Sequence, residues 1–328
     1  MLNKKRNLRL MAGIFIIGIV CMFEYAELSY EDVLRLVTFA RKRPANDKSR
    51  SCTTCVTGWM NDMWFTKRFQ PSVRPLLSKR NCMLSENTYK WWQRLQYVTR
   101  RANYTKVVKE LFQIIPGKDH YLDGGSDRCR VCSVLGNSGN LLGSHYGDQI
   151  DSGDCVIRMN KAPTKGYERD VGTRTTHHIF YPESAVNVSN DTNVVLFPFK
   201  TLDLEWLMSA LTNGTIKRTR ENVPARINAD KDKVMVLSPA FMRYVHTSWL
   251  QNKGVYPSTG FLALIFSLHI CDKVNVYGFG ANRNRVWHHY FEPPPKNFRL
   301  NVPHSVSNEY SVILELSKRK KIQLFTGI

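Results

Sequence analysis

The 328-residue sequence is short of acidic residues, and it has no internal repeat and no low-complexity segment. Only 27 Asp and Glu stand against 47 Lys and Arg, which gives a formal net charge of +20. This charge predicts an anionic partner, but nucleic acid, an acidic membrane surface or a phosphorylated small substrate would each fit. The content of 43% hydrophobic residues excludes a disordered chain, and the length suffices for one large α/β domain or two smaller ones.

No uninterrupted apolar run reaches the length of an ordinary membrane-spanning helix. The N-terminal run, residues 10–23, follows a basic cluster and carries no charge. As a helix it would be about 21 Å long, which is less than the roughly 30 Å of the hydrocarbon core. This pattern fits a cleaved signal peptide or a short signal-anchor, with a buried core helix as the alternative.

An uncleaved anchor is favoured because the run ends Val20-Cys21-Met22-Phe23 and lacks the small residues of an A-x-A cleavage site. Basic residues precede the run and almost none directly follow it, so the positive-inside rule places the N-terminus in the cytosol. We therefore predict a cytoplasmic tail at residues 1–9, a signal-anchor at 10–23, a stem at 24–50 and a lumenal domain at 51–328.

Two further features agree with a lumenal domain. Four Asn-x-Ser/Thr sequons predict N-glycosylation at Asn103, Asn187, Asn190 and Asn213. Seven cysteines follow the anchor, and in an oxidising lumen most of them should pair while one remains over. The two C-x-x-C pairs, at residues 52–55 and 129–132, would also suit zinc, but the interval between them is far longer than in a zinc ribbon.

Short apolar runs rich in β-branched residues alternate with helical patterns from residue 131 onward. Seven strands are predicted, at residues 131–135, 155–159, 177–181, 193–197, 233–237, 274–278 and 322–325. Helices are predicted at residues 202–211, 239–250, 261–270 and 307–317, and an aromatic-rich helical pattern occupies 59–112. The alternation predicts a mostly parallel sheet with helices on both faces, whose ligands bind at the carboxyl ends of the strands.

Amide side chains follow the first two predicted strands. The first strand ends in a turn that contains Asn137 and Ser138, and Asn160 follows the second strand. Asn side chains at these positions can bond a nucleotide or a sugar, whereas the alternative is a tight turn and an ordinary loop.

Two hydroxyls and a glycine, Ser258, Thr259 and Gly260, precede the apolar helix predicted at 261–270. The free N–H groups and the positive end of the helix dipole bind phosphate well at such a position. The alternative is a plain Ser/Thr N-cap.

Two adjacent histidines, His288 and His289, lie in the loop after the sixth strand. Gly280 and Trp287 precede them in the same loop. Their position suggests a metal or an oxyanion, but no third ligand at suitable spacing accompanies them. The D-x-D string at residues 230–232 lies in a lysine-flanked turn, which indicates solvated surface, so no metal site is predicted.

His304 lies just before the last predicted helix, with four residues between it and Glu309. A neutral imidazole suits the removal of a proton from a hydroxyl nucleophile, and we expect the nearby carboxylate to orient it. The alternative is an ordinary surface histidine.

Taken in order, these segments resemble the four motifs of the animal sialyltransferases. GNSGNL, RMNKAPT and VGTRTTHHIFYPES match the long motif, and YPSTGFLALIFSLHICDKVNVYGFG matches the short motif. HYFE matches motif III, and His304 with Glu309 matches the very short motif. The strings YPSTG, WHHY and FPFKTLDLEW, with TYKWWQRLQ upstream, resemble the α-2,3-sialyltransferases within this family.

The resemblance implies a single Rossmann-like domain, a GT-A-like variant, on a Golgi membrane. It implies transfer of sialic acid from CMP-sialic acid to the galactose 3-hydroxyl of Galβ1,3GalNAc glycans on glycoproteins or glycolipids. The reaction inverts the anomeric centre and needs no metal and no cofactor. Three properties remain open: the preferred acceptor, the cleavage of the stem, and the oligomeric state, for which a homodimer is one option.

The resemblance also implies roles for residues. His304 would be the base, and His289 would contact the departing phosphate. The donor would be bound by Asn137, Ser138, Asn160, Ser258, Thr259, Gly260, Gly280 and Trp287, and the acceptor by Gln96, Tyr181 and Tyr256. Disulfides would join Cys132 to Cys271 and Cys52 to Cys129, and by elimination Cys55 to Cys82.

Two departures from the family affect these expectations. Relatives often carry a third cysteine beside Cys52, and a donor-contacting Tyr is replaced within residues 219–221. Two other functions fit the sequence less well. A basic nucleic-acid binder does not explain an anchor with four sequons, and a silent sugar-binding module of the same fold would lose the base that His304 supplies.

Overall fold

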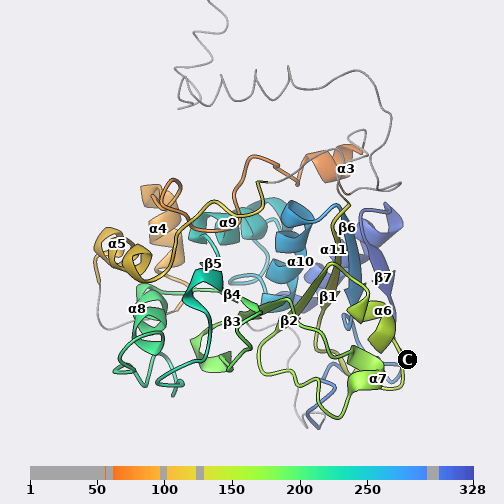
Figure 1. Ribbon diagram of the computed structural model, residues 1–328. Helices are drawn as coiled ribbons and strands as arrows, with labels where there is room; N and C mark the ends of the chain where they lie inside the picture. The colour runs from red at the N-terminus through yellow and green to blue at the C-terminus, as the bar shows by residue number, and fades with distance from the viewer. Residues whose placement is uncertain (1–55, 57–61, 97–101, 123–128, 294–302) are drawn as a thin grey trace, which may run out of the picture. The chain divides into compact units, whose positions relative to one another are not determined.

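Seven parallel strands form the centre of the molecule in the computed structural model, which describes residues 56, 62–96, 102–122, 129–293 and 303–328. The strands are β1 (Val131–Leu135), β2 (Cys155–Met159), β3 (His177–Phe180), β4 (Asn193–Leu196), β5 (Val234–Val236), β6 (Lys273–Tyr277) and β7 (Gln323–Phe325). Their order in the sheet is β5-β4-β3-β2-β1-β6-β7, and every neighbouring pair is parallel (Figure 1). The predicted α/β, Rossmann-like fold is therefore confirmed.

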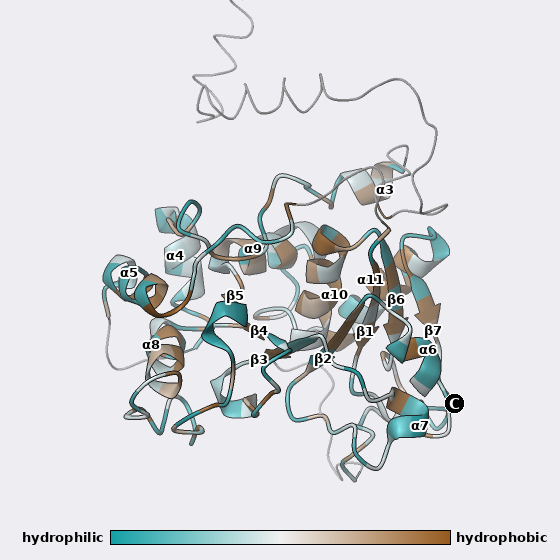
Figure 2. Cartoon of the chain, in the orientation of Figure 1, coloured by the Kyte–Doolittle hydropathy of each residue, from teal (hydrophilic) through white to brown (hydrophobic). Residues whose placement is uncertain are grey.

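The inner strands are apolar because both faces of the sheet are covered. All five residues of β2 are buried, whereas β7 at the edge is partly exposed. Side chains alternate between the faces, so Ile157 belongs to the large core cluster and Val156 to a second one with Ile150 and Val171. Figure 2 shows strand β1 as mostly hydrophobic.

One face is covered by α10 (Thr259–Ile270), which contacts β1, β2, β3 and β6. The second core cluster places α6 (Gly147–Asp151) and α7 (Glu168–Val171) on the other face. The remaining helices of this part of the chain are α8 (Thr201–Ala210), α9 (Pro239–Tyr244) and α11 (Val306–Lys318). Short 3₁₀ turns are η1 (Gly139–Leu141), η2 (Pro182–Ser184) and η3 (Lys231–Lys233).

Three helices precede the sheet: α3 (Met63–Thr66), α4 (Glu86–Trp92) and α5 (Tyr104–Ile114). The buried residues of α5 are Tyr104, Val107, Val108 and Leu111, which is the spacing of an amphipathic helix. Figure 1 shows α5 beside α8, which it contacts. The helical pattern predicted over 59–112 is interrupted, because residues 67–84 form no helix.

The predicted helix at 239–250 differs from the structure in its second half. It begins as α9 but continues as a π-helix, η4 (Val245–Trp249), and Leu250 N donates to Val245 O at 3.3 Å. A single extra residue per turn leaves the apolar spacing almost unchanged, so periodicity does not reveal it.

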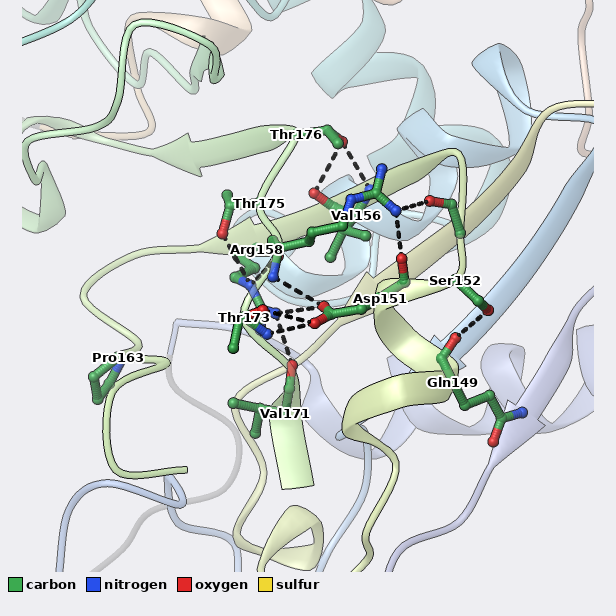
Figure 3. A network of polar contacts seen from close by, with 12 residues as sticks. Gln149, Asp151, Ser152, Val156, Arg158, Pro163, Val171, Thr173, Thr175 and Thr176 are labelled. Atoms are coloured by element: carbon green, nitrogen blue, oxygen red, sulfur yellow. Dashed lines mark hydrogen bonds and ion pairs between the residues drawn. The ribbon is translucent and has the colours of Figure 1, made fainter. Parts of the chain in front are cut away.

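A buried arginine holds the second face of the sheet together (Figure 3). Arg158 of β2, with only 3% of its surface exposed, donates to Val171 O at 2.7 Å and to Thr175 Oγ1 at 3.0 Å, and lies 3.7 Å from Asp151. Burial lowers the pKa of Arg158 to about 10, so its guanidinium stays charged at neutral pH. This network joins β2 to the ends of α6 and α7.

The cysteines agree in part with the expected pairing. Cys132 and Cys271 form a disulfide, and Cys129 is also disulfide-bonded. Cys82 is a thiol in the structure, which differs from the expected pair with Cys55. Cys52 and Cys55 lie outside the described residues, so the expected pair of Cys52 with Cys129 stays a prediction.

The predicted anchor and stem, residues 10–50, also lie outside the described residues. In the part of the chain that the structure describes, no helix is long and apolar enough to cross a membrane.

Candidate active site

The strand order reverses between β1 and β6, and such a switch point is where α/β sheets bind ligands. The two loops that leave these strands are in direct contact. Ser138 N donates to Gly278 O at 3.0 Å, and Ser138 Oγ donates to Gly280 O at 2.6 Å. A Cβ atom on Gly136 would lie 2.2 Å from Gly278 O, so the loops approach too closely for any other residue.

Two amide side chains border this contact, each after its own strand. Asn137 Nδ2 donates to Met159 O at 3.5 Å, so it reaches from the β1 loop to the end of β2. Asn160 has a left-handed backbone with φ of 57°, and its Oδ1 accepts from Ser184 Oγ at 2.8 Å. This bond leaves the Nδ2 group of Asn160 as the donor that can serve a ligand.

The N-terminus of α10 lies beside the same loops. Ser258 caps the helix by accepting from Phe261 N at 3.1 Å, and a Cβ on Gly260 would lie 3.2 Å from the ring of Phe279 in the β6 loop. The backbone N–H groups of Thr259 and Gly260 belong to the first turn and have no acceptor within the helix. They suit a phosphate oxygen.

Glu309 does not orient His304 as predicted. It is 5% exposed, and its two oxygens accept from Ser258 N at 2.8 Å and Ser258 Oγ at 2.5 Å. Burial raises the pKa of Glu309, while the bonds from Ser258 and the proximity of His304 act in the opposite direction. Glu309 therefore positions the N-terminus of α10.

His304 is held by a backbone carbonyl instead. Its Nδ1 lies 3.0 Å from Tyr256 O, and its ring packs edge-on against the Tyr256 ring at 4.9 Å. A carbonyl only accepts, so the proton must sit on Nδ1, which leaves the lone pair on Nε2. His304 thus lies beside residues 256–258 with its basic nitrogen available.

The motif III segment runs along the β1 loop. Gly139 N donates to His288 O at 2.8 Å, and Tyr290 N donates to Asn137 O at 2.9 Å. The His289 side chain is exposed, and its Nδ1 lies 2.7 Å from Glu292 Oε2. Trp287 packs edge-on against Tyr310 at 5.6 Å.

The three residues expected at the acceptor converge on residues 198–200, which follow β4. The Phe199 ring lies 6.0 Å from that of Tyr181 and 5.0 Å from that of Tyr256. Gln96 Oε1 accepts from Lys200 Nζ at 2.6 Å. An aromatic row therefore leads from Tyr181 to His304.

Sequence reasoning missed Lys200 and the acidic residues Asp203 and Glu183 that lie near it. The signal was present as a lysine within an apolar string, followed three residues later by an aspartate.

Within the described residues, no group of three or more His, Cys, Asp or Glu could hold a metal ion. The D-x-D segment forms the turn η3, where Asp230 Oδ1 accepts from Asp232 N at 3.0 Å. The four sequon asparagines are exposed.

Comparisons with known proteins identify the family. Residues 76–321 match the model of glycosyltransferase family 29 (sialyltransferase). The chain is 47% identical over 289 residues to human CMP-N-acetylneuraminate-beta-galactosamide-alpha-2,3-sialyltransferase 1, which covers 87% of this chain and 85% of the human protein. It is 43% identical over 288 residues to rat CMP-N-acetylneuraminate-beta-galactosamide-alpha-2,3-sialyltransferase 2. This match covers 87% of this chain and 82% of the rat protein.

A solved structure is also similar. A mammalian sialyltransferase in complex with Gal-beta-1-3GalNAc-ortho-nitrophenol shares 47% sequence identity and has a TM-score of 0.80 over 85% of this chain and 100% of that one. The family match extends over most of the chain, and the same fold recurs in this relative. The chain therefore belongs to glycosyltransferase family 29 and is a sialyltransferase.

Proposed function

We propose that the chain transfers sialic acid from CMP-sialic acid to the 3-hydroxyl of galactose in Galβ1,3GalNAc-terminated glycans of glycoproteins or glycolipids. The transfer inverts the anomeric centre and uses no metal ion. The observation that carries this proposal is the bond from His304 Nδ1 to Tyr256 O, which leaves Nε2 as a base beside the N-terminus of α10. The names of the human and rat relatives, and the Gal-beta-1-3GalNAc ligand of the mammalian structure, support the linkage and the acceptor.

On the donor side, the amides of Asn137 and Asn160 bind the nucleotide and its phosphate. The N-terminus of α10, with Ser258, Thr259 and Gly260, faces the phosphate, because its N–H groups and dipole favour negative charge. Ser138, Gly280 and Trp287 line the same site. The contact between the β1 and β6 loops supports this assignment, since it gathers these residues at the switch point.

The reaction is a direct displacement. His304 Nε2 removes the proton from the galactose 3-hydroxyl as the oxygen attacks C2 of sialic acid, and the bond from C2 to the phosphate oxygen of CMP breaks. The phosphate of CMP is a weak base, so it leaves without a strong acid. The enzyme has to stabilise only the developing negative charge on the phosphate. His289 and the N–H groups of α10 provide this stabilisation.

On the acceptor side, Gln96, Tyr181 and Tyr256 bind the disaccharide. Phe199 contacts both tyrosine rings, and Tyr256 contacts His304, so a sugar along this row would lie next to the base.

The location of the enzyme is proposed from its sequence. Residues 1–9 form a cytoplasmic tail, 10–23 a signal-anchor and 24–50 a stem, and residues 51–328 form the catalytic domain in the Golgi lumen. Exposure of Asn103, Asn187, Asn190 and Asn213 agrees with their glycosylation.

The test is a transfer assay with the full chain in detergent. The protein is incubated with CMP-sialic acid and either Galβ1,3GalNAc or Galβ1,4GlcNAc in the presence of EDTA, and the linkage is read from the product by NMR. We expect an α-2,3 product on the first acceptor. Transfer only to the second acceptor would reject the proposed acceptor, and loss of transfer in EDTA would reject the metal-free reaction.

A further inference from the structure

A buried ionic cluster lies beneath the proposed acceptor site. Lys200 is 2% exposed and Asp203 is fully buried, and Lys200 Nζ lies 2.7 Å from Asp203 Oδ1. Glu183 lies 3.8 Å from the same ammonium and is itself held by Thr219 Oγ1 and Arg220 N. Burying such charges costs free energy, and an apolar set of the same volume is often no less stable.

The ammonium of this cluster has a contact that points to a role. Lys200 Nζ donates to Gln96 Oε1 at 2.6 Å. An ammonium carries three donors and no acceptor, so it selects the oxygen of the Gln96 amide. The two N–H donors of that amide are therefore directed away from the lysine.

The cluster is fixed to the aromatic row. Asp203 Oδ2 accepts from Phe199 N at 2.8 Å, and Phe199 contacts the rings of Tyr181 and Tyr256. On the other side, Trp92 at the end of α4 donates from Nε1 to Pro198 O at 2.8 Å. Two bonds thus attach the α4 segment, which carries Gln96, to residues 198–200.

We infer that Lys200, held by Asp203 and Glu183, is a positioning residue that presents the Gln96 amide N–H groups to an acceptor oxygen and so determines acceptor recognition. The inference rests on the proposed function, because the sugar that Gln96 binds is the proposed acceptor.

The first test uses Gln96→Glu, which keeps an oxygen for Lys200 but replaces the N–H donors with a second acceptor. We expect KM for Galβ1,3GalNAc to rise about tenfold at pH 7, as for the loss of a hydrogen bond, with KM for CMP-sialic acid and the melting temperature unchanged. A purely structural role for Gln96 would leave the acceptor KM unchanged, and that result would overturn the inference.

The second test is a double-mutant cycle between Gln96→Ala and Lys200→Met, with the exposed Lys109→Met as the control for charge. If Lys200 acts through Gln96, the double variant has the acceptor KM of Gln96→Ala alone. Full additivity of the two effects contradicts the inference. Should Lys200→Met fail to fold because Asp203 loses its partner, Lys200→Met with Asp203→Asn replaces it in the cycle, since Asn still accepts from Phe199 N.

The wild-type protein separates the two hypotheses. If it does not transfer to Galβ1,3GalNAc, the proposed function fails. If it does, but the Gln96 and Lys200 variants keep its acceptor KM, only the positioning role fails.

Discussion

The proton on His304 Nδ1 decides which atom of the site can act as a base. The Tyr256 carbonyl holds it there, so no carboxylate is needed to set the tautomer. Glu309, which lies in the first turn of α11, is free to bond both donors of Ser258. Tyr256 therefore fixes the proposed base, and Glu309 fixes the helix N-terminus that faces the phosphate in the proposed reaction.

Replacing His304 by Ala should lower the transfer rate by about 100-fold or more, because general base catalysis is lost. The variant should fold and bind CMP with unchanged affinity, since the donor contacts lie on other residues. Transfer is measured with saturating substrates, and CMP binding by calorimetry. The exposed His145→Asn, which keeps a residue that tolerates its φ of 56°, is the control. Wild-type turnover in His304→Ala would remove the base assignment.

At the residue scale, the sequence predicts which residue types gather at the site, but it does not predict which side chains form hydrogen bonds with each other. The spacing between His304 and Glu309 predicts that the two side chains interact. The direction of the Glu309 side chain is instead set by the start of α11 at Val306, which turns Glu309 toward Ser258. Lys200 was missed because its partners Gln96 and Glu183 are remote in sequence, and only the fold brings them together.

Among the elements, α10 is distinctive because residues 261–268 are all buried. A helix that is apolar on every side carries no amphipathic pattern, but its apolar run predicted it nonetheless. Near its end, the ring of His269 packs against those of Phe69, Phe241 and Tyr244, at 4.6, 5.1 and 5.6 Å. Burial lowers the pKa of His269 to about 3.

This histidine should make the fold sensitive to acid. Its pKa in the folded protein lies below the ordinary value near 6.5, so the unfolded chain binds the proton first and stability is lost as the pH falls from 6.5 toward 3. From pH 8 to pH 5 the loss attributable to His269 is about 2 kcal/mol. Urea unfolding at the two pH values measures the free energy of unfolding. Between pH 8 and pH 5, the His269→Phe variant should lose about 2 kcal/mol less of this free energy than the wild type. Equal losses would show that burial does not hold the imidazole neutral.

The contact between the β1 and β6 loops offers a second test at this scale. Gly278 has a φ of 70°, and a Cβ there would lie 2.6 Å from Gly136 O. Gly278→Ala should push the loops apart and weaken CMP binding by about tenfold, which corresponds to 1.4 kcal/mol. The matched control is Gly166→Ala, whose φ is 88° but whose Cβ would meet nothing within 4 Å. If both variants bind CMP equally well, the loop contact does not shape the donor site.

The strands were predictable because both faces of the sheet are covered, which makes each inner strand a continuous apolar run between turns. The order of the strands was not, since it depends on which side of β1 the sixth strand joins, and no local pattern encodes that choice. The π-helix at Val245–Trp249 was missed for a related reason, because one extra residue in a turn leaves the spacing almost intact.

For the whole molecule, the disulfide between Cys132 and Cys271 ties two distant parts of the chain. Cys132 lies near the start of β1, and Cys271 ends α10 just before β6, so the bond clamps the ends of these strands that lie opposite the proposed donor site. The sequence separation of 139 residues makes the closed loop long.

Replacing both cysteines by Ala should therefore lower the free energy of unfolding substantially. The chain-entropy model gives about 5 kcal/mol for a loop of this length, as an upper estimate. The urea midpoint of the variant, compared with that of the oxidised wild type, measures the loss. Coincident midpoints would contradict this account of the bond.

The attachment of α4 through Trp92 and Gln96 has a consequence for how such an enzyme diversifies. The proposed donor site is formed by the loops at the strand ends and by the N-terminus of the buried helix α10, where almost any change disturbs the core. The proposed acceptor site also includes Gln96, which belongs to a peripheral segment docked at two points. New glycan preferences can therefore arise by remodelling that segment while the machinery for the activated sugar is inherited unaltered.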